Sequence, residues 1–178
     1  TFSPKKGDGR FSMQLFAPYP FFYSVDEKSS EIGKIEPLFQ FPINYATPHA
    51  FGMKSDEKYN NIINFGDVKV PFKVVMMATG ESNNPVVTNL ETLEFLKLNG
   101  SLSVGDTVTI YRDSQGVLRA ELKRSDELID IISWIDEEST LFELNVGDNL
   151  IAASDDGGGT NLTTRFSYNP AVVAVYES

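Results

Sequence analysis

Apolar and polar residues alternate with a period of two over most of this chain, which is the pattern of half-buried β-strands. Stretches with this pattern recur about every 8 to 12 residues, a spacing typical of a β-sandwich or barrel. The expected strands are 10–16, 62–65, 68–77, 93–98, 107–111, 117–122, 128–134, 141–144, 149–153, 162–168 and 171–176. The pattern therefore predicts an all-β, antiparallel β-sandwich.

Turn-forming residues stand between these stretches. Gly66, Gly105 and Gly147 are each followed by aspartate; glycine adopts positive φ without strain, and an aspartate side chain can close a turn. Residues 102–108 (LSVGDTV) and 144–150 (LNVGDNL) share one pattern, so we expect the same turn twice, with positive φ at Gly105 and Gly147. Most connections between strands are expected to be hairpins.

Only one stretch, residues 125–136, has the pattern of a helix. Ser125 could cap it, and Leu128, Ile131 and Ile135 recur at helical spacing. The same residues also fit a buried strand, and their β-branched isoleucines favour a strand or a strand followed by a turn. The sandwich should therefore contain at most one short helix.

Prolines divide the N-terminal third of the chain. The strand at 10–16 stops at 17–20 (APYP), because proline cannot donate to a strand ladder. Residues 24–59 mix charged residues with further prolines, and only 38–43 resembles an edge strand. The expected divisions are 1–24 for the end of a preceding domain and its junction, 25–178 for the sandwich, and 25–60 within it for an irregular covering segment. The chain starts without methionine, as a processed or excised fragment would.

Composition narrows the class of protein. The 178 residues are 41% hydrophobic, enough to fill one core. Asp and Glu number 25 against 15 Lys and Arg, a net charge of −10 that repels nucleic-acid phosphates and anionic lipids. No apolar run approaches the roughly 18 residues of a membrane helix. No nucleic-acid partner and no membrane insertion are expected.

Candidate chemistry is sparse. The chain has no cysteine and only His49, which excludes disulfides, thiolate nucleophiles and His-based metal cages. A paired-carboxylate site of the glycosidase kind is conceivable where acidic residues cluster, but a solvated face is the expectation with this many carboxylates. The clustered carboxylates are Asp126, Glu127, Asp130, Asp136, Glu137 and Glu138. We therefore predict no catalytic, cofactor-binding or metal-binding residue, and no enzyme.

Three aromatic residues are candidates for stacking on a glycan, namely Trp134, Tyr111 and Tyr168. Trp134 is followed by Glu137, a faint likeness to the tryptophan and glutamate of galactose-binding lectin sites. The alternation pattern places each of the three equally well in a packed core. A carbohydrate-binding module is therefore the alternative function.

From residue 61 onwards the chain resembles the C-terminal domain of the distal tail proteins of long-tailed, non-contractile phages. The similar motifs stand in the family's order: 64–71 (NFGDVKVP), 84–89 (NPVVTN), 105–110 (GDTVTI) and 139–151 (STLFELNVGDNLI). Upstream, 10–23 is similar to the last strand of the family's N-terminal ring domain and the aromatic and proline-rich junction behind it. All these motifs are turn and strand elements.

The resemblance implies a galectin-like, jelly-roll β-sandwich with a structural role and no cofactor. Such a domain projects from a homohexameric ring, the baseplate hub at the tail tip, which joins the tail tube to the host-adsorption apparatus of a phage or prophage. The implied partners are the tail tube, the tape measure protein and a tail-associated adhesin, with a host glycan as a further partner. The implied location is the virion tail tip, after synthesis in the cytoplasm of an infected or lysogenic bacterium.

The same resemblance bears on assembly. The ring contacts belong mainly to the N-terminal domain, which is nearly absent from this chain. The full-length parent is therefore expected to be a homohexamer, and this chain alone a monomer. The His-Asn-Pro-Arg strand of true galectins is absent from the sequence, so sugar binding does not follow from the fold.

Overall fold

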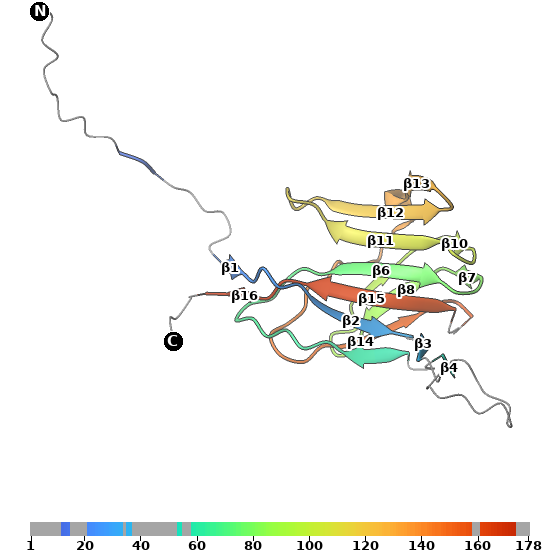
Figure 1. The fold of residues 1–178 in the computed structure, drawn as a ribbon, viewed down its shortest axis with the longest axis horizontal. Helices are drawn as coiled ribbons and strands as arrows, with labels where there is room; N and C mark the ends of the chain where they lie inside the picture. Colours follow the sequence, from blue (N-terminus) through green and yellow to red (C-terminus); the bar gives the residue numbers. More distant parts are fainter. Residues whose placement is uncertain are drawn as a thin grey trace, which may run out of the picture.

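The computed structural model describes residues 12–14, 21–33, 35–36, 53–54, 58–157 and 161–173. Two main antiparallel sheets pack around one core (Figure 1). The larger sheet contains, in spatial order, β13 (Glu127–Asp130), β12 (Leu118–Arg124), β11 (Thr107–Arg112), β6 (Lys73–Ala78), β15 (Leu162–Tyr168) and β2 (Lys28–Ile32). The smaller contains β5 (Tyr59–Asn61), β14 (Leu150–Ser154), β8 (Val86–Asn89) and β9 (Phe95–Lys97). The predicted all-β sandwich is confirmed.

Three short ribbons complete the described fold. They pair β1 (Phe22–Tyr23) with β16 (Ala171–Val172), β7 (Ser82–Asn83) with β10 (Ser101–Leu102), and β3 (Ile35–Glu36) with β4 (Met53–Lys54). The β1–β16 ribbon projects from one end of the sandwich, at the left in Figure 1. The chain therefore enters and leaves the sandwich side by side.

The alternation in the sequence becomes rows of side chains across the larger sheet. In β6, Val74, Met76 and Ala78 are buried, whereas Lys73 and Met77 are exposed and Val75 is half-buried. The strand register extends each buried position into a row, because residues directly opposite in an antiparallel pair lie on the same face. One such row consists of Ala120, Ile110, Val74 and Phe166.

An aromatic cluster closes the core between the sheets. The ring centroid of Phe72 lies 5.0 Å from that of Phe142 and 5.8 Å from that of Phe166. Both contacts are tilted, within the distance range in which aromatic pairs attract beyond simple burial. Phe166 comes from β15, so the cluster ties the centre of the larger sheet to the loops that cross over it.

Two expected strands are wrong. Residues 62–65 and 141–144 form only isolated bridges, which pair Asn64 with Gly147 and Val70 with Leu144. The alternation of buried and exposed side chains holds at 62–65, but the buried Asn64 side chain bonds to the Gly66 N–H and the Val68 carbonyl oxygen and so turns the chain away from the ladder. Polar groups that bond locally in this way compete with strand pairing.

Three strands of the main sheets were missed, β2, β5 and β8, as were the strands of the short ribbons other than β16. The segment 25–60 was expected to be an irregular cover, yet β2 in it is an edge strand of the larger sheet, paired with β15 from Thr164↔Ile32 to Tyr168↔Lys28. The strand β8 is short and follows Pro85, so its alternation was too brief to recognise. Of the expected strand at 10–16, the described residues 12–14 are not in a strand, and the remainder lies outside the described residues, as does 38–43.

The expectation that most connections are hairpins is also wrong. Among the main-sheet strands, sequential neighbours pair only in β8–β9, β11–β12 and β12–β13, whereas the centre of the larger sheet joins β11, β6 and β15. Strands far apart in sequence meet there because the chain crosses repeatedly between the two sheets. The favoured interpretation of 125–136, a strand followed by a turn, is confirmed: β13 leads directly into the short 3-10 helix η1 (Ile132–Trp134), the single helical element among the described residues.

A buried hydroxyl in the core makes the first testable prediction. Thr164 lies in the apolar row with Met76 and Ile32, is 0% exposed, and its Oγ1 has no hydrogen-bond partner. Valine has nearly the same shape as threonine but carries a methyl group in place of the hydroxyl. The substitution therefore removes the free-energy cost of burying a hydroxyl that has no partner. Thr164→Val is expected to raise the free energy of unfolding by about 1 kcal/mol, measured by urea denaturation.

The neighbouring threonine provides the control. Thr163 Oγ1 donates to the Gly33 carbonyl oxygen at 3.1 Å. Thr163→Val should therefore lower the free energy of unfolding by about 1 kcal/mol. Equal effects of the two substitutions would contradict the assignment of the unpartnered hydroxyl.

Candidate functional site

Two of the six clustered carboxylates, Asp130 and Asp136, act as hydrogen-bond acceptors in turns. Asp130 Oδ1 accepts a hydrogen bond from the Ile132 backbone N–H at 2.9 Å. Asp136 accepts from the Asn99 amide and from the Glu138 backbone N–H, both at 2.9 Å. These two bonds hold the pKa of Asp136 below its ordinary value, and the bond from Asn99 has the larger effect. A catalytic acid needs a raised pKa, so this carboxylate is poised for structure rather than proton transfer.

Metal-ligand geometry is also lacking in the described part of the chain. No group of three or more His, Asp or Glu side chains there is arranged to hold an ion. Asp156 is engaged by the Asn84 amide at 2.5 Å and by the Lys97 ammonium at 3.9 Å. His49 lies outside the described residues. Among the described residues, no helix has the length and apolar character to cross a membrane.

The three aromatic candidates lie in different surroundings. Tyr168 is only 4% exposed, its hydroxyl donates to the Ile63 carbonyl oxygen, and burial raises its pKa. Tyr111 is half-buried, and its hydroxyl donates to Glu121 Oε1 at 3.0 Å, a bond that raises the pKa of Tyr111. Trp134 is half-buried, with its indole against Gly100, where a side chain would collide with the ring.

A groove of about 270 Å³ brings two of these aromatics together. Tyr111 and Tyr168 line it, and Trp134 does not. Its remaining lining residues are Tyr23, Glu27, Pro71, Phe72, Lys73, Arg112, Ser167 and Asn169. Tyr168 is almost fully buried where it lines the groove. Of the three lining tyrosines, only Tyr23 and Tyr111 therefore expose much of their side chain to solvent.

The turn glycines fall into two kinds. Gly105 and Gly147 have φ values of +88° and +84°, with no atom within 4 Å of where a Cβ would stand. Only the backbone conformation therefore requires glycine there. Gly66 is different: its φ lies outside the left-handed region, and a Cβ would stand 2.8 Å from the Ala171 backbone nitrogen. Gly66 permits close packing, and Asn64 Oδ1 accepts its N–H at 3.0 Å in an Asx-turn.

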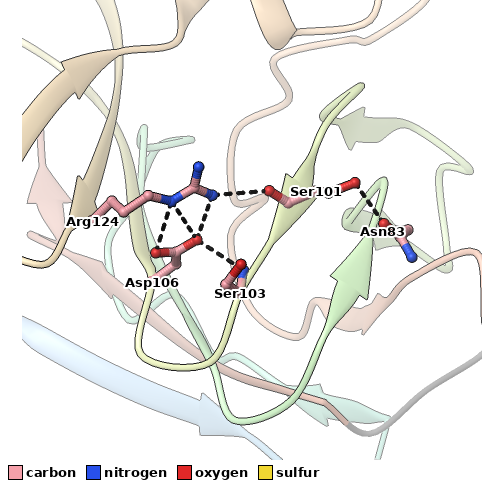
Figure 2. A network of polar contacts seen from close by, with 5 residues as sticks. All are labelled: Asn83, Ser101, Ser103, Asp106 and Arg124. Atoms are coloured by element: carbon pink, nitrogen blue, oxygen red, sulfur yellow. Dashed lines mark hydrogen bonds and ion pairs between the residues drawn. The ribbon is translucent and has the colours of Figure 1, made fainter.

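The first Gly-Asp turn carries a buried ion pair (Figure 2). Asp106 is 3% exposed, and its Oδ2 accepts the Ser103 backbone N–H at 2.8 Å. Arg124 on β12 donates from Nε to both carboxylate oxygens, at 3.1 and 3.0 Å, and from Nη2 to Oδ2 at 2.6 Å. The bond from Arg124, the largest effect, and the weaker bond from Ser103 hold the pKa of Asp106 below its ordinary value. Burial by itself would raise this pKa, and the two bonds together outweigh burial.

The same arginine reaches a second element. Its Nη2 also donates to the Ser101 carbonyl oxygen at 3.2 Å, and Ser101 Oγ donates to Asn83 Oδ1 at 2.6 Å. Figure 2 shows the resulting chain of contacts from β12 through the turn to the β7–β10 ribbon. We call this network of Asn83, Ser101, Ser103, Asp106 and Arg124 the arginine clasp. It joins three segments that are separate in sequence.

The second Gly-Asp turn is closed by a different residue. Asn149 is 0% exposed; its Oδ1 accepts the Asn145 backbone N–H at 2.8 Å, and its amide donates to the carbonyl oxygens of Asn145, Gly147 and Ile62. Asp148, the counterpart of Asp106, instead accepts from the Asn61 amide at 2.6 Å. The repeated sequence therefore forms two turns with similar backbones and different closing side chains.

Sequence reasoning missed the clasp and the buried asparagines. Arg124 is 18 residues from Asp106, and nothing in the local pattern pairs them. Asn64 and Asn149 lie within the motifs at 64–71 and 139–151. Their place in these motifs was the one feature of the sequence that could have indicated their structural role. Both side chains are buried and bond to backbone groups, so asparagine has a structural role at both positions in this chain.

The two positive-φ glycines make a prediction. Gly105→Ala and Gly147→Ala should each lower the free energy of unfolding by about 1 to 2 kcal/mol, because a Cβ is unfavourable in the left-handed region. Gly157 is the control, since its φ is ordinary and its nearest atom, Asp155 Oδ1, lies at 3.4 Å. Gly157→Ala should be neutral or slightly stabilising in the same urea titration. A loss at Gly157 as large as at Gly105 would contradict the backbone argument.

The arginine clasp predicts a pH dependence. Asp106→Asn should lower the free energy of unfolding by about 1 to 2 kcal/mol at pH 7, since Arg124 is half-exposed and the pair is partly screened. The pKa of Asp106 is lower in the folded protein than its ordinary 3.8, so its stabilising effect is present above that value. The difference between native protein and variant should stay constant from pH 8 to about 5 and shrink as pH falls below about 4.

The exposed carboxylate of Asp126 is the control for this titration. Asp126→Asn should change the free energy of unfolding by less than about 0.5 kcal/mol at pH 7. A stability difference for Asp106→Asn that persists unchanged at pH 2 would show that the carboxylate charge is not the cause.

Comparison with known proteins agrees with a structural role for these motifs. The family described as "Siphovirus-type tail component, C-terminal domain" matches residues 65–171, more than half of the chain. The crystal structure of the SPP1 Dit (gp 19.1) protein, described as a paradigm of the hub adsorption apparatus in Gram-positive infecting phages, has a similar fold, with a TM-score of 0.59 and 10% identity. The similarity covers 86% of this chain and 49% of that one, so this chain spans about half of its length. No curated protein matches. On the family match over residues 65–171, this chain belongs to the siphovirus-type tail components and carries their C-terminal domain.

Proposed function

We propose that this chain is the C-terminal part of a distal tail protein, the hub that links the tail tube to the host-adsorption apparatus at the tail tip of a phage or prophage. The observation that carries the proposal is the family match over 65–171, supported by the fold shared with the SPP1 hub protein. The polar side chains of the described residues fit this role, since they close turns and join strands. Such groups build a rigid scaffold rather than a reaction centre.

The domain division supports the same proposal. Residues 1–24 would be the end of a preceding ring domain, and 25–178 the sandwich. The described part of the junction is fixed to the sandwich: β1 pairs with β16, and the Ser24 N–H donates to the Pro170 carbonyl oxygen at 2.8 Å. A domain on the N-terminal side would therefore be held close to one end of the sandwich.

The proposed partners are the tail tube, the tape measure protein and a tail-associated adhesin. A closed ring needs two complementary patches on each subunit. With most of the ring domain absent, this chain alone would be monomeric, and its net charge of −10 opposes self-association further. The full-length parent would form the homohexamer.

The carbohydrate-binding alternative rests on the groove that Tyr23 and Tyr111 line. It is secondary because the predicted stacking residues do not share one exposed face: Tyr168 is buried and Trp134 lies elsewhere. A tail hub is the function that the whole fold supports, whereas the groove involves one end of one sheet.

Location tests the proposal directly. Antibodies raised against this chain, applied to intact virions with gold labels, are expected to mark the tail tip in electron micrographs. Light scattering should give a monomer for the chain and a six-membered assembly for the full-length parent. Labels distributed along the tube or on the capsid would refute the hub role, and a stable hexamer of the chain alone would refute the ring argument.

A further inference from the structure

Exposed apolar side chains gather at the end of the sandwich where the chain enters and leaves. Five of them form what we call the apolar end: Phe22, Ile63, Phe65, Val146 and Val173, with exposed fractions of 58%, 41%, 69%, 53% and 58%. They come from four separate segments, so their gathering is a product of the fold. Contiguous exposed apolar surface on a soluble domain commonly marks an interaction site.

Backbone pairing places three of these residues together. Asn64 and Gly147 exchange both backbone hydrogen bonds, at 2.8 and 2.9 Å. The next residues along, Phe65 and Val146, are therefore opposite each other, on the face away from buried Asn64. Ile63 lies two residues from Phe65 and shares that outward face.

The β1–β16 ribbon adjoins this loop. The Asp67 N–H donates to the Ala171 carbonyl oxygen at 2.8 Å, and the Val173 N–H donates to Asp67 Oδ2 at 3.2 Å. Gly66 lies directly against the Ala171 backbone. Phe22 is paired with Val172 in the same ribbon. The loop at 65–67 therefore lies directly along β16, and the five apolar residues are distributed over this loop, the neighbouring loop at 144–149 and the ribbon, at the end of the sandwich where Figure 1 labels β1 and β16.

The apolar end is held rigidly. Buried Asn64 bonds to the Val68 and Leu144 carbonyl oxygens, and buried Asn149 bonds to Ile62 and Gly147 beside it. A loop fixed in this way cannot turn Phe65 and Val146 inward to escape water. A pre-organised apolar surface loses little conformational entropy when a partner covers it.

We infer that the apolar end is the docking surface for the domain that precedes this one in the same polypeptide. The inference rests on the proposed domain order and adds where the two domains touch. The chain reaches the sandwich through Phe22 itself, so any preceding domain is tethered at this surface at high effective concentration. The matched family is a C-terminal domain, and the solved hub protein of similar fold is about twice as long. The expected partner face is apolar, to match the residues it covers.

Hydroxyl-radical footprinting with mass spectrometry tests the contact, because it reports the solvent access of individual side chains. Phe22 and Phe65 are expected to be oxidised at least about fivefold more slowly in the full-length parent than in this chain alone. Leu128 on β13, 65% exposed, serves as the internal reference and should be oxidised equally in both.

A double substitution, Phe65→Asp with Val146→Asp, should restore rapid oxidation of Phe22 in the parent, whereas Leu128→Asp should not. Both residues are exposed, so the double variant of the isolated chain should have a melting temperature within about 2 °C of the native value. This measurement is the control for intact folding.

Three outcomes overturn the inference. Equal oxidation of Phe65 in chain and parent would show that the apolar end stays open; if the parent still forms a ring and marks the tail tip, the proposed function survives alone. Protection that depends on protein concentration would assign the surface to a second copy. A parent without any preceding domain would remove the proposed domain order together with this contact.

Discussion

Strands that end inside a sandwich leave backbone N–H and C=O groups that must find partners away from water, and this requirement governs much of the structure. A buried backbone polar group without a partner costs about as much as a lost hydrogen bond. At the strand ends of this protein the partners are short polar side chains. Asn149 satisfies four backbone groups around one turn, Asn64 three around another, and Asp106 closes a third with the help of Arg124. Buried side chains therefore hold these three turns in place through hydrogen bonds to the backbone.

These hydrogen bonds give the turn and strand motifs of the sequence a structural role in this chain. Asn64 is itself part of the Asn64–Gly147 bridge, and Asn149 lies two residues beyond Gly147. Their side chains bond across to the Leu144 and Ile62 carbonyl oxygens, so the loops at 61–70 and 144–149 fix each other. Fixed loops present their outer residues at set positions, and here those residues are apolar, such as Phe65 and Val146. The same buried amides that stabilise the end of the sandwich thereby shape the surface available to a partner.

The arginine clasp plays the corresponding part at the β7–β10 ribbon. A buried carboxylate is costly unless it is paired and hydrogen-bonded, and Asp106 has both a bidentate arginine and a backbone donor. Arg124 keeps part of its side chain in water while joining the turn to Ser101. The short strands β7 and β10 are in this way attached to β12 of the larger sheet.

The local pattern was enough to predict the all-β class, the strand at 162–168 and the strand followed by a turn within 125–136, because alternation and β-branching are local properties that burial on one face imposes. Positive φ at Gly105 and Gly147 was likewise readable from Gly-Asp turns. Only the tertiary structure decided that β2 completes the larger sheet, that β6 lies between β11 and β15, and that Arg124 meets Asp106. Those pairings join residues far apart in the chain, and the free energy that selects them comes from shared burial, which no local pattern records.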